Sequence, residues 1–113
     1  MKRLRIAVPS AGDGGLEDTV SKVFGRANTF TIVDAEDEIG SVELLKNPAV
    51  SYKHGAGPIV VKMLVDSGVN VVLSAELGPG ASALLDQHNI THVVVKPGAG
   101  VKESVRKALN EIK

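Results

Sequence analysis

Apolar and polar residues alternate in the first part of the chain with the period of two that is typical of β-strands. Residues 4–8 alternate in this way until Pro9, which predicts a first strand. Residues 29–33 and 41–45 predict a second and a third strand. The short acidic segment 34–40 joins these two strands, and a connection of this length implies an antiparallel hairpin.

The spacing of apolar residues changes in the second half, where helical and strand patterns alternate. Helices are expected over residues 58–67, 79–88 and 101–112, because apolar residues recur there every three or four positions. Largely apolar strands are expected between them, over residues 69–73 and 91–95. This alternation is typical of parallel strands joined by right-handed helical crossovers.

The connection between the first two predicted strands is rich in glycine. Residues 10–18 hold three glycines and three acids, which predicts a loop. The backbone amides of residues 10–15 could form a nest for an anion. The alternative is a mobile loop without a ligand. Residues 20–23 are expected to form one helical turn before Gly25.

A hairpin followed by helical crossovers predicts a five-stranded mixed sheet with helices on both faces. The expected strand order is 3-2-1-4-5 with the second strand antiparallel, which is the α/β three-layer topology of ribonuclease H-like proteins. Several loops then gather at the edge where the parallel strands end, which is the usual place for ligands in open α/β sheets. These loops contain residues 12–15, Arg26, residues 54–57, residues 75–80 and residues 98–100.

Length and composition favour a single domain that has no strong overall electrostatic field. The 113 residues are 43% hydrophobic, which suits a single compact domain over residues 1–113. Thirteen basic and thirteen acidic residues leave no net charge to attract nucleic acid or an anionic membrane. One tyrosine and two phenylalanines are too few to stack bases. We therefore expect neither nucleic acid nor a membrane as a partner, and any anion site must be local.

The absence of cysteine limits the chemistry further. This chain alone cannot form a disulfide or hold a metal cluster through thiolates. No signal-peptide pattern precedes the first strand, and no apolar stretch approaches the length of a membrane-spanning helix, so a cytoplasmic protein is expected. An edge strand could pair across a dimer, so monomer and homodimer are both open.

The segment 54–58, His-Gly-Ala-Gly-Pro, is a candidate binding loop. His54 could ligate a metal as a neutral imidazole or meet an anion as a cation, with the amides of Gly55 and Gly57 beside it. Pro58 is expected at the first helical position, which would point the positive end of the helix at the ligand. The alternative is a tight turn with an exposed histidine.

Two further loops carry candidate ligand groups. The guanidinium of Arg26 suits a carboxylate, a phosphate or a sulfide-rich anion. The alternative is that Arg26 pairs with an acid such as Asp34 while Phe24 packs in the core. Gly78 precedes Pro79, which is expected at the first position of the next helix. The amide of Gly78 could donate to an anion, or this segment could be a structural turn only.

Little in the sequence favours an enzyme. A two-metal nuclease needs clustered carboxylates, and the first predicted strand has none. A hydrolase needs a nucleophile within reach of a base, and Ser10 with His54 is the pair that the sequence suggests. His88 lies on the apolar stripe of its predicted helix and His92 lies inside a predicted strand, so both are expected to be structural.

Four segments keep the order and spacing of one known family. They are the strand that ends at Pro9, Val-Ser-x-x-Phe-Gly-Arg-Ala at 20–27, His-Gly-Ala-Gly-Pro at 54–58 and Leu-Gly-Pro-Gly-Ala at 77–81. The chain resembles the dinitrogenase iron-molybdenum cofactor biosynthesis family, which includes NifX-type carriers and the C-terminal domain of NifB-type proteins. The resemblance implies a ribonuclease H-like domain that binds an iron-sulfur-based cofactor, or its precursor, and holds it or hands it on without chemistry.

The resemblance also has consequences for residues and partners. His54 and Arg26 match the family pattern and carry over as candidate ligands. The pattern often has a histidine directly before Phe-Gly-Arg, where this chain has Val23, so delivery to nitrogenase is not implied. A cluster held without thiolates should be labile, and the apo form is expected after purification. A donor or acceptor protein is an expected partner. The alternatives are a metal-free oxyanion-binding or protein-interaction module and a hydrolase.

Overall fold

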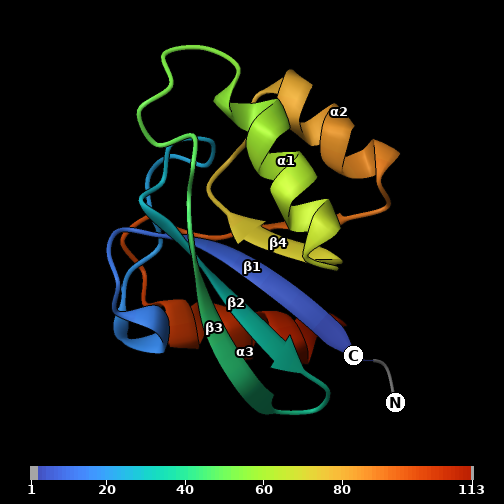
Figure 1. The fold of residues 1–113 in the computed structure, drawn as a ribbon. Coiled ribbons are helices and arrows are strands. Elements are labelled where there is room, and N and C mark those ends of the chain that lie inside the picture. Colours follow the sequence, from blue (N-terminus) through green and yellow to red (C-terminus); the bar gives the residue numbers. More distant parts are fainter. Residues whose placement is uncertain (1–2, 113) are drawn as a thin grey trace.

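A central mixed sheet organises the molecule, as Figure 1 shows for the computed structural model, which describes residues 3–112. Its five strands lie in the order β3-β2-β1-β4-β5. The strands are β1 (Leu4–Ser10), β2 (Thr29–Ala35), β3 (Ile39–Lys46), β4 (Val71–Ser74) and β5 (Thr91–Val94). The helices are α1 (Ala56–Asp66), α2 (Pro79–Gln87), α3 (Val101–Ile112) and the short 3-10 helix η1 (Gly15–Glu17).

The strand directions confirm the expected topology. β1 pairs antiparallel with β2, from Leu4 opposite Ala35 to Ser10 opposite Thr29, and β2 pairs antiparallel with β3. β4 lies parallel to β1, and β5 lies parallel to β4. The carboxyl ends of β1, β3, β4 and β5 therefore share one edge with the start of β2. The segments at this edge, called the loop edge below, are residues 11–28, 47–55, 75–78 and 95–100.

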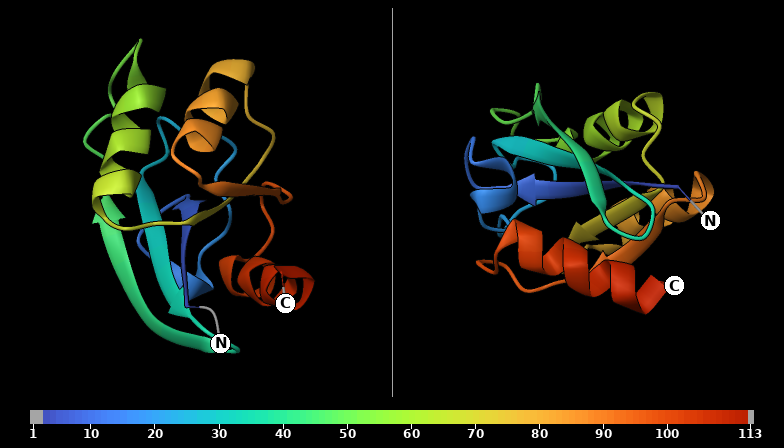
Figure 2. Two further views of the ribbon diagram at one scale, coloured as in Figure 1. Left: turned by 90° about the vertical axis from the view of Figure 1, so that its right-hand side faces the viewer. Right: turned by 90° about the horizontal axis from the view of Figure 1, so that it is seen from below.

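Two layers of apolar side chains cover the two faces of the sheet. Helices α1 and α2 pack on one face and α3 on the other, as the views in Figure 2 show. The alternation along β1 explains this, because Ala7 faces α1 and α2 while Ile6 and Val8 face α3. Each face buries a separate core, so the sheet is held rigidly between the helices.

The prediction of a helical turn over residues 20–23 is wrong. Val20 instead forms an isolated antiparallel bridge with Ser10, and its N–H donates to the carbonyl of Ala99 at 2.8 Å. The N–H of Gly98 returns a bond to the carbonyl of Val20 at 2.9 Å. Tertiary hydrogen bonds to the end of β1 and to the loop 95–100 outweigh the weak helical pattern of four residues.

Two details of the helices also differ from the expectation. Helix α1 begins at Ala56, so Pro58 is its third residue and not its first. His88 is the exposed C-cap residue of α2 and does not lie on a buried stripe. Within residues 3–112, no helix is both long enough and apolar enough to span a bilayer.

Candidate functional site

The segment around Phe24 forms one wall of the candidate site. The Phe24 ring is buried and meets Phe30 of β2 edge to face, with 5.6 Å between ring centroids. Gly25 lies against the first turn of α1, where a Cβ atom on Gly25 would be only 3.0 Å from the Gly57 nitrogen and 3.1 Å from the Ala56 Cβ. Glycine at this position therefore allows the two segments to touch.

The side chain of Asn47 joins this wall to the loop that leads into α1. Its Nδ2 donates to the carbonyls of Gly25 at 2.9 Å and Ala27 at 2.8 Å, and its Oδ1 accepts the N–H of Ala49 at 2.9 Å. Asn47 is only 4% exposed. These long-range bonds could not be read from the sequence pattern.

Helix α1 presents uncapped amides at the loop edge. Its N-cap residue is Gly55, which is left-handed with φ of 76° and forms no side-chain cap. Glycine adopts this backbone conformation without strain. The amides of the first helical turn, including that of Gly57, have no acceptor within the helix. His54 precedes the N-cap residue and is exposed.

Helix α2 begins at the same edge. Its N-cap residue is Gly78, also without a side-chain cap, and Pro79 is the first helical residue as predicted. A Cβ atom on either Gly57 or Gly78 would meet nothing within 4 Å, so there is open space in front of both helix starts. Partial positive charge at two helix N-termini favours an anion there.

A pocket of about 290 Å³ lies between these segments. Its lining comprises Lys22, Val23, Phe24, Gly25, Gly57, Ala75, Glu76, Leu77, Gly78 and Ala81. The structure thus brings together the predicted residues Gly57 and Gly78. The predicted residues Arg26, His54 and Gly55 are not in this lining, although Arg26 directly follows Gly25. Val23 lines the pocket and is 46% exposed.

Two stretches that reach the loop edge carry cations and no acid, whereas the acids of this edge, Asp13, Glu17, Asp18 and Glu76, lie outside these stretches. Residues 19–33 contain Lys22 and Arg26 and no acid, and residues 44–65 contain three lysines and His54 and no acid. Glu76 is the single acid in the pocket lining given above. Lys22 was not predicted as a site residue, although the acid-free stretches were a visible signal in the sequence.

Phe24 packs in the core, as one alternative for its loop predicted, but the predicted Arg26–Asp34 pair and the open anion nest are not what the structure shows. Arg26 does not pair with Asp34, because Asp34 accepts a bond from Arg5 at 2.8 Å, and Arg26 is exposed at the loop edge. The glycine-rich nest already holds a carboxylate of the chain itself. Oδ2 of Asp18 accepts the N–H groups of Gly12 at 2.8 Å and Gly14 at 3.1 Å.

Asp18 is therefore a structural ligand of its own loop. Burial by itself raises the pKa of its carboxyl, but hydrogen bonds from the amides of Thr19, Gly14 and Gly12 outweigh this and lower the pKa below the usual value. The ionised carboxylate fills the nest, so this loop is not a site for a second anion.

The predicted hydrolase pair does not form a nucleophile and base. Ser10 is fully buried, and its hydroxyl donates to the carbonyl of Val8 at 3.0 Å and lies 2.6 Å from the hydroxyl of Thr31. His54 is exposed in a separate loop. The Ser10 hydroxyl is therefore committed to the sheet and is not open to a substrate.

A different serine and histidine do meet. The Ser74 hydroxyl donates to the carbonyl of Ala75 at 2.9 Å and lies 2.8 Å from Nε2 of His92. When the single hydroxyl proton of Ser74 goes to the Ala75 carbonyl, Nε2 of His92 is the donor in this contact, which requires the tautomer that carries its proton on Nε2. Burial lowers the pKa of His92 more than its hydrogen bonds near Ser74 and Ala75 raise it. Ser74 is buried, so this pair ties β4 to β5.

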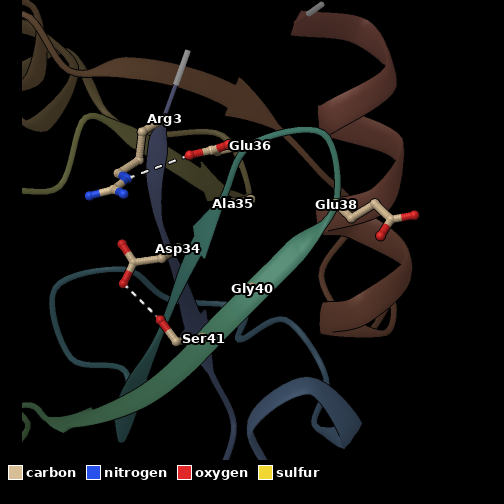
Figure 3. A pocket seen from close by; sticks show the side chains of 7 residues that line it. All are labelled: Arg3, Asp34, Ala35, Glu36, Glu38, Gly40 and Ser41. Carbon is tan, nitrogen blue, oxygen red and sulfur yellow. Dashed lines mark hydrogen bonds and ion pairs between the residues drawn. The ribbon is translucent and has the colours of Figure 1, made fainter. Parts of the chain in front are cut away.

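Two other hollows have different surroundings. One, of about 300 Å³, lies at the β2–β3 turn among Asp34, Glu36 and Glu38, as Figure 3 shows. The acidic side chains that line it would repel an anion, and Asp34 already accepts hydrogen bonds from Ser41 and Arg5. A broader groove of about 1090 Å³ runs between β5 and α3. It shares Ala75 and Glu76 with the candidate pocket.

The donor set of the loop edge fits a bound anion better than a coordinated metal ion. Within residues 3–112, no three histidine, aspartate or glutamate side chains come together as a metal-binding group. Backbone amides, Lys22, Arg26 and one imidazole are instead available, and the chain has no cysteine. His54 as a single metal ligand stays a prediction.

The fold defines a small α/β protein of ribonuclease H-like topology, and two uncapped helix starts meet glycine-rich segments at its loop edge. The chain belongs to the dinitrogenase iron-molybdenum cofactor family, whose model matches residues 2–111. This confirms the resemblance found in its motifs.

Individual relatives agree with this assignment. The uncharacterized protein MJ0580 of Methanocaldococcus jannaschii is 31% identical over 91 residues, which are 80% of this chain and 73% of that protein. The apo form of the orange protein from Desulfovibrio gigas has a similar structure, with a TM-score of 0.86 and 34% identity over 95% of this chain and 88% of that chain. TM1290 from Thermotoga, a proposed NifB protein of the DUF35 family, has a TM-score of 0.75 and 33% identity over 96% of this chain and 88% of that chain.

Proposed function

We propose that this protein binds and carries an anionic iron-sulfur-based metallocofactor, or a precursor of one, and performs no chemistry on it. Residues 1–113 act in this proposal as one binding domain. The cargo docks among Arg26, His54 and the amides of Gly55, Gly57 and Gly78, and a donor or acceptor protein exchanges it.

The convergence of three loops on one pocket is the observation that carries the proposal. Gly25, Gly57 and Gly78 come from connections far apart in the sequence, and all three line the same hollow. Two helices start there without side-chain caps, and the segments 19–33 and 44–65 supply cations and no acids. Amides and cations recognise charge without requiring a covalent ligand.

The lack of thiolates favours a carrier over a permanent holder. Cysteine ligands make an iron-sulfur centre a fixed part of a protein, and this chain has none. Membership of the dinitrogenase iron-molybdenum cofactor family and the similarity to a proposed NifB protein support a cofactor of this class. A cargo held by hydrogen bonds and charge leaves readily, so we expect the purified protein in its apo form.

Anaerobic reconstitution tests the proposal. The protein is incubated with iron and sulfide or with an isolated cluster, desalted, and examined by absorption spectroscopy and metal analysis. Loss of a charge-assisted hydrogen bond costs ~1.5 to 3 kcal/mol, so Arg26→Ala should weaken binding roughly 10- to 150-fold at ~1.4 kcal/mol per tenfold. His54→Ala should weaken it at least as much if the imidazole ligates a metal.

A matched double variant supplies the control. Arg106→Ala with His88→Ala removes the same residue types from exposed positions on α3 and at the end of α2. It should bind like the wild type. If the Arg26→Ala, His54→Ala protein keeps unchanged metal content and affinity, the site lies elsewhere.

A second experiment, read together with the iron retention, decides between the carrier and a metal-free module. A phosphate or sulfate titration followed by amide chemical shifts shows whether a simple oxyanion occupies the pocket. Shifts at Gly57 and Gly78 with no retained iron would favour the oxyanion-binding alternative.

A further inference from the structure

The buried amide of Asn47 connects the two cation-bearing loops of the candidate site. We propose that Asn47 is a positioning residue, which sets where Lys22 and Arg26 stand relative to the start of α1. This inference rests on the function proposed above, because it concerns the same pocket. Asn47 itself is absent from the pocket lining and is not proposed to touch the ligand.

Only an asparagine satisfies the surroundings of this side chain. The two Nδ2 protons go to the carbonyls of Gly25 and Ala27, and Oδ1 accepts the N–H of Ala49. An aspartate of the same shape cannot donate when ionised, and alanine leaves two carbonyls without these donors. Since the site is buried, water replaces these bonds poorly.

The two carbonyls bracket Arg26. Asn47 holds the residue before Arg26 and the residue after it, so the backbone of the arginine is fixed on both sides. The same bonds press Gly25 onto Ala56 and Gly57, where the contact leaves no room for a Cβ atom. A displaced loop would therefore change both the wall of the pocket and the access to the Gly57 amide.

A structural role alone would affect stability without a selective effect at the site. Asn70 provides the comparison, because its side-chain Oδ1 also bonds to backbone, accepting the N–H of Arg5 at 2.9 Å. Asn70 lies just before β4, at the opposite edge of the sheet from the pocket. Asn70→Ala should lower thermal stability and leave the loop edge unchanged.

The test compares Asn47→Ala and Asn47→Asp with Asn70→Ala in two measurements. Hydrogen exchange and amide chemical shifts in the ligand-free protein report on residues 24–27 and Gly57. Anaerobic reconstitution with iron and sulfide reports the affinity. Both Asn47 variants should show faster exchange over residues 24–27, and iron retention should weaken at least about tenfold, the lower end for one lost charge-assisted bond.

The Asn47→Asp variant tests the hydrogen bonds themselves. A protonated carboxyl donates one hydrogen bond, so protection over residues 24–27, corrected for the pH dependence of intrinsic exchange and compared with Asn47→Ala at the same pH, should return in part as the pH falls. If Asn47→Ala does not fold, Asn47→Ser keeps a small donor and replaces it in both measurements.

Each failure has a separate meaning. Wild-type protein that retains no iron would overturn the proposed function, and the exchange measurement would still decide the role of Asn47. Exchange and affinity that match the wild type in the Asn47 variants would overturn the positioning role alone. An equal loss of affinity in Asn70→Ala would also overturn it, since the effect would then follow stability.

Discussion

The two edges of the sheet use their charges in opposite ways. At the β2–β3 turn two of the acids have partners: Figure 3 shows Arg3 paired with Glu36, and Asp34 accepting a hydrogen bond from Ser41. The guanidinium of Arg5 bonds to Asp34, to Glu43 and to the carbonyl of Ser67. The charges of this edge therefore hold β1, β2, β3 and the end of α1 together.

The loop edge leaves its cations uncommitted. The ion pairs formed within residues 3–112 include none from Lys22, Arg26, Lys53 or His54. Surface cations that form no ion pair can interact favourably with a bound anion. The difference between the edges supports the proposal that the loop edge, and not the β2–β3 edge, binds an anion.

Substitution of one glycine at each edge is the strongest test of whether only the loop edge binds a ligand. Gly25→Ala places a Cβ atom 3.0 Å from the Gly57 nitrogen, and Gly40→Ala places one 2.9 Å from the Asp34 carbonyl oxygen. Both contacts are with backbone, so each should destabilise by about 1 to 3 kcal/mol. Only Gly25→Ala should abolish iron retention after reconstitution. Equal retention in the two variants would show that the pocket does not depend on this contact.

The overall fold was predictable because it depends on periodicity. Strand alternation, helical spacing and short connections determine topology through contacts that every chain of this pattern makes. The loop edge was predictable for the same reason, since glycine and proline mark the region of both helix starts, although only Pro79 is the first residue of its helix. The sequence alone also identified the family.

The hydrogen-bond partners within the site were not predictable. Asn47 bonds to residues twenty and more positions away, and Asp18 fills a nest that looked open to an anion. A polar side chain in a loop has many possible partners, and the tertiary arrangement selects among them. The start of α1 was misplaced because a proline is tolerated throughout the first helical turn.

Substitution of Arg5 tests whether the charges at the β2–β3 edge stabilise the fold. Burial by itself raises the pKa of Asp34, but hydrogen bonds from Arg5 and Ser41 and the positive charge nearby lower it below 3.8 overall. Arg5→Met should lower the free energy of unfolding by about 1 to 3 kcal/mol at neutral pH, because charged hydrogen bonds are lost. It should leave anion binding unchanged. Urea unfolding measures the cost.

The pH dependence gives this prediction its sign. A carboxyl with a lowered pKa stabilises the fold above its unfolded pKa, and this contribution is lost as the pH falls through the folded pKa. The difference in the free energy of unfolding between wild type and Arg5→Met should therefore become smaller at acidic pH. A difference that stays constant from neutral pH to strong acid would show that the Arg5–Asp34 pair adds nothing.

Alanine substitutions at Gly57 and Gly80 distinguish an effect on the space for the ligand from an effect on helix stability. Both lie in the first turn of a helix, and a Cβ atom on either meets nothing within 4 Å. Alanine should leave stability unchanged or raise it by up to about 1 kcal/mol in both cases. Gly57 lines the pocket and Gly80 does not, so only Gly57→Ala should weaken iron retention, by several-fold. Weakening in Gly80→Ala of the same size would point to a ligand held more widely along α2.

The smallest expected effect concerns His92, which titrates in a different range from Asp34. Burial lowers its pKa below the usual 6.5, so the folded protein favours the neutral ring. The unfolded chain then binds a proton more readily, and stability should fall as the pH drops below 6.5 toward the folded pKa. His92→Gln should remove this slope between about pH 7.5 and pH 5.5 in urea unfolding. His88→Gln, which changes an exposed histidine, should keep it. If His88→Gln removed the slope instead, the neutral-to-acid loss of stability would arise at the end of α2 and not at the Ser74–His92 contact beside the loop edge.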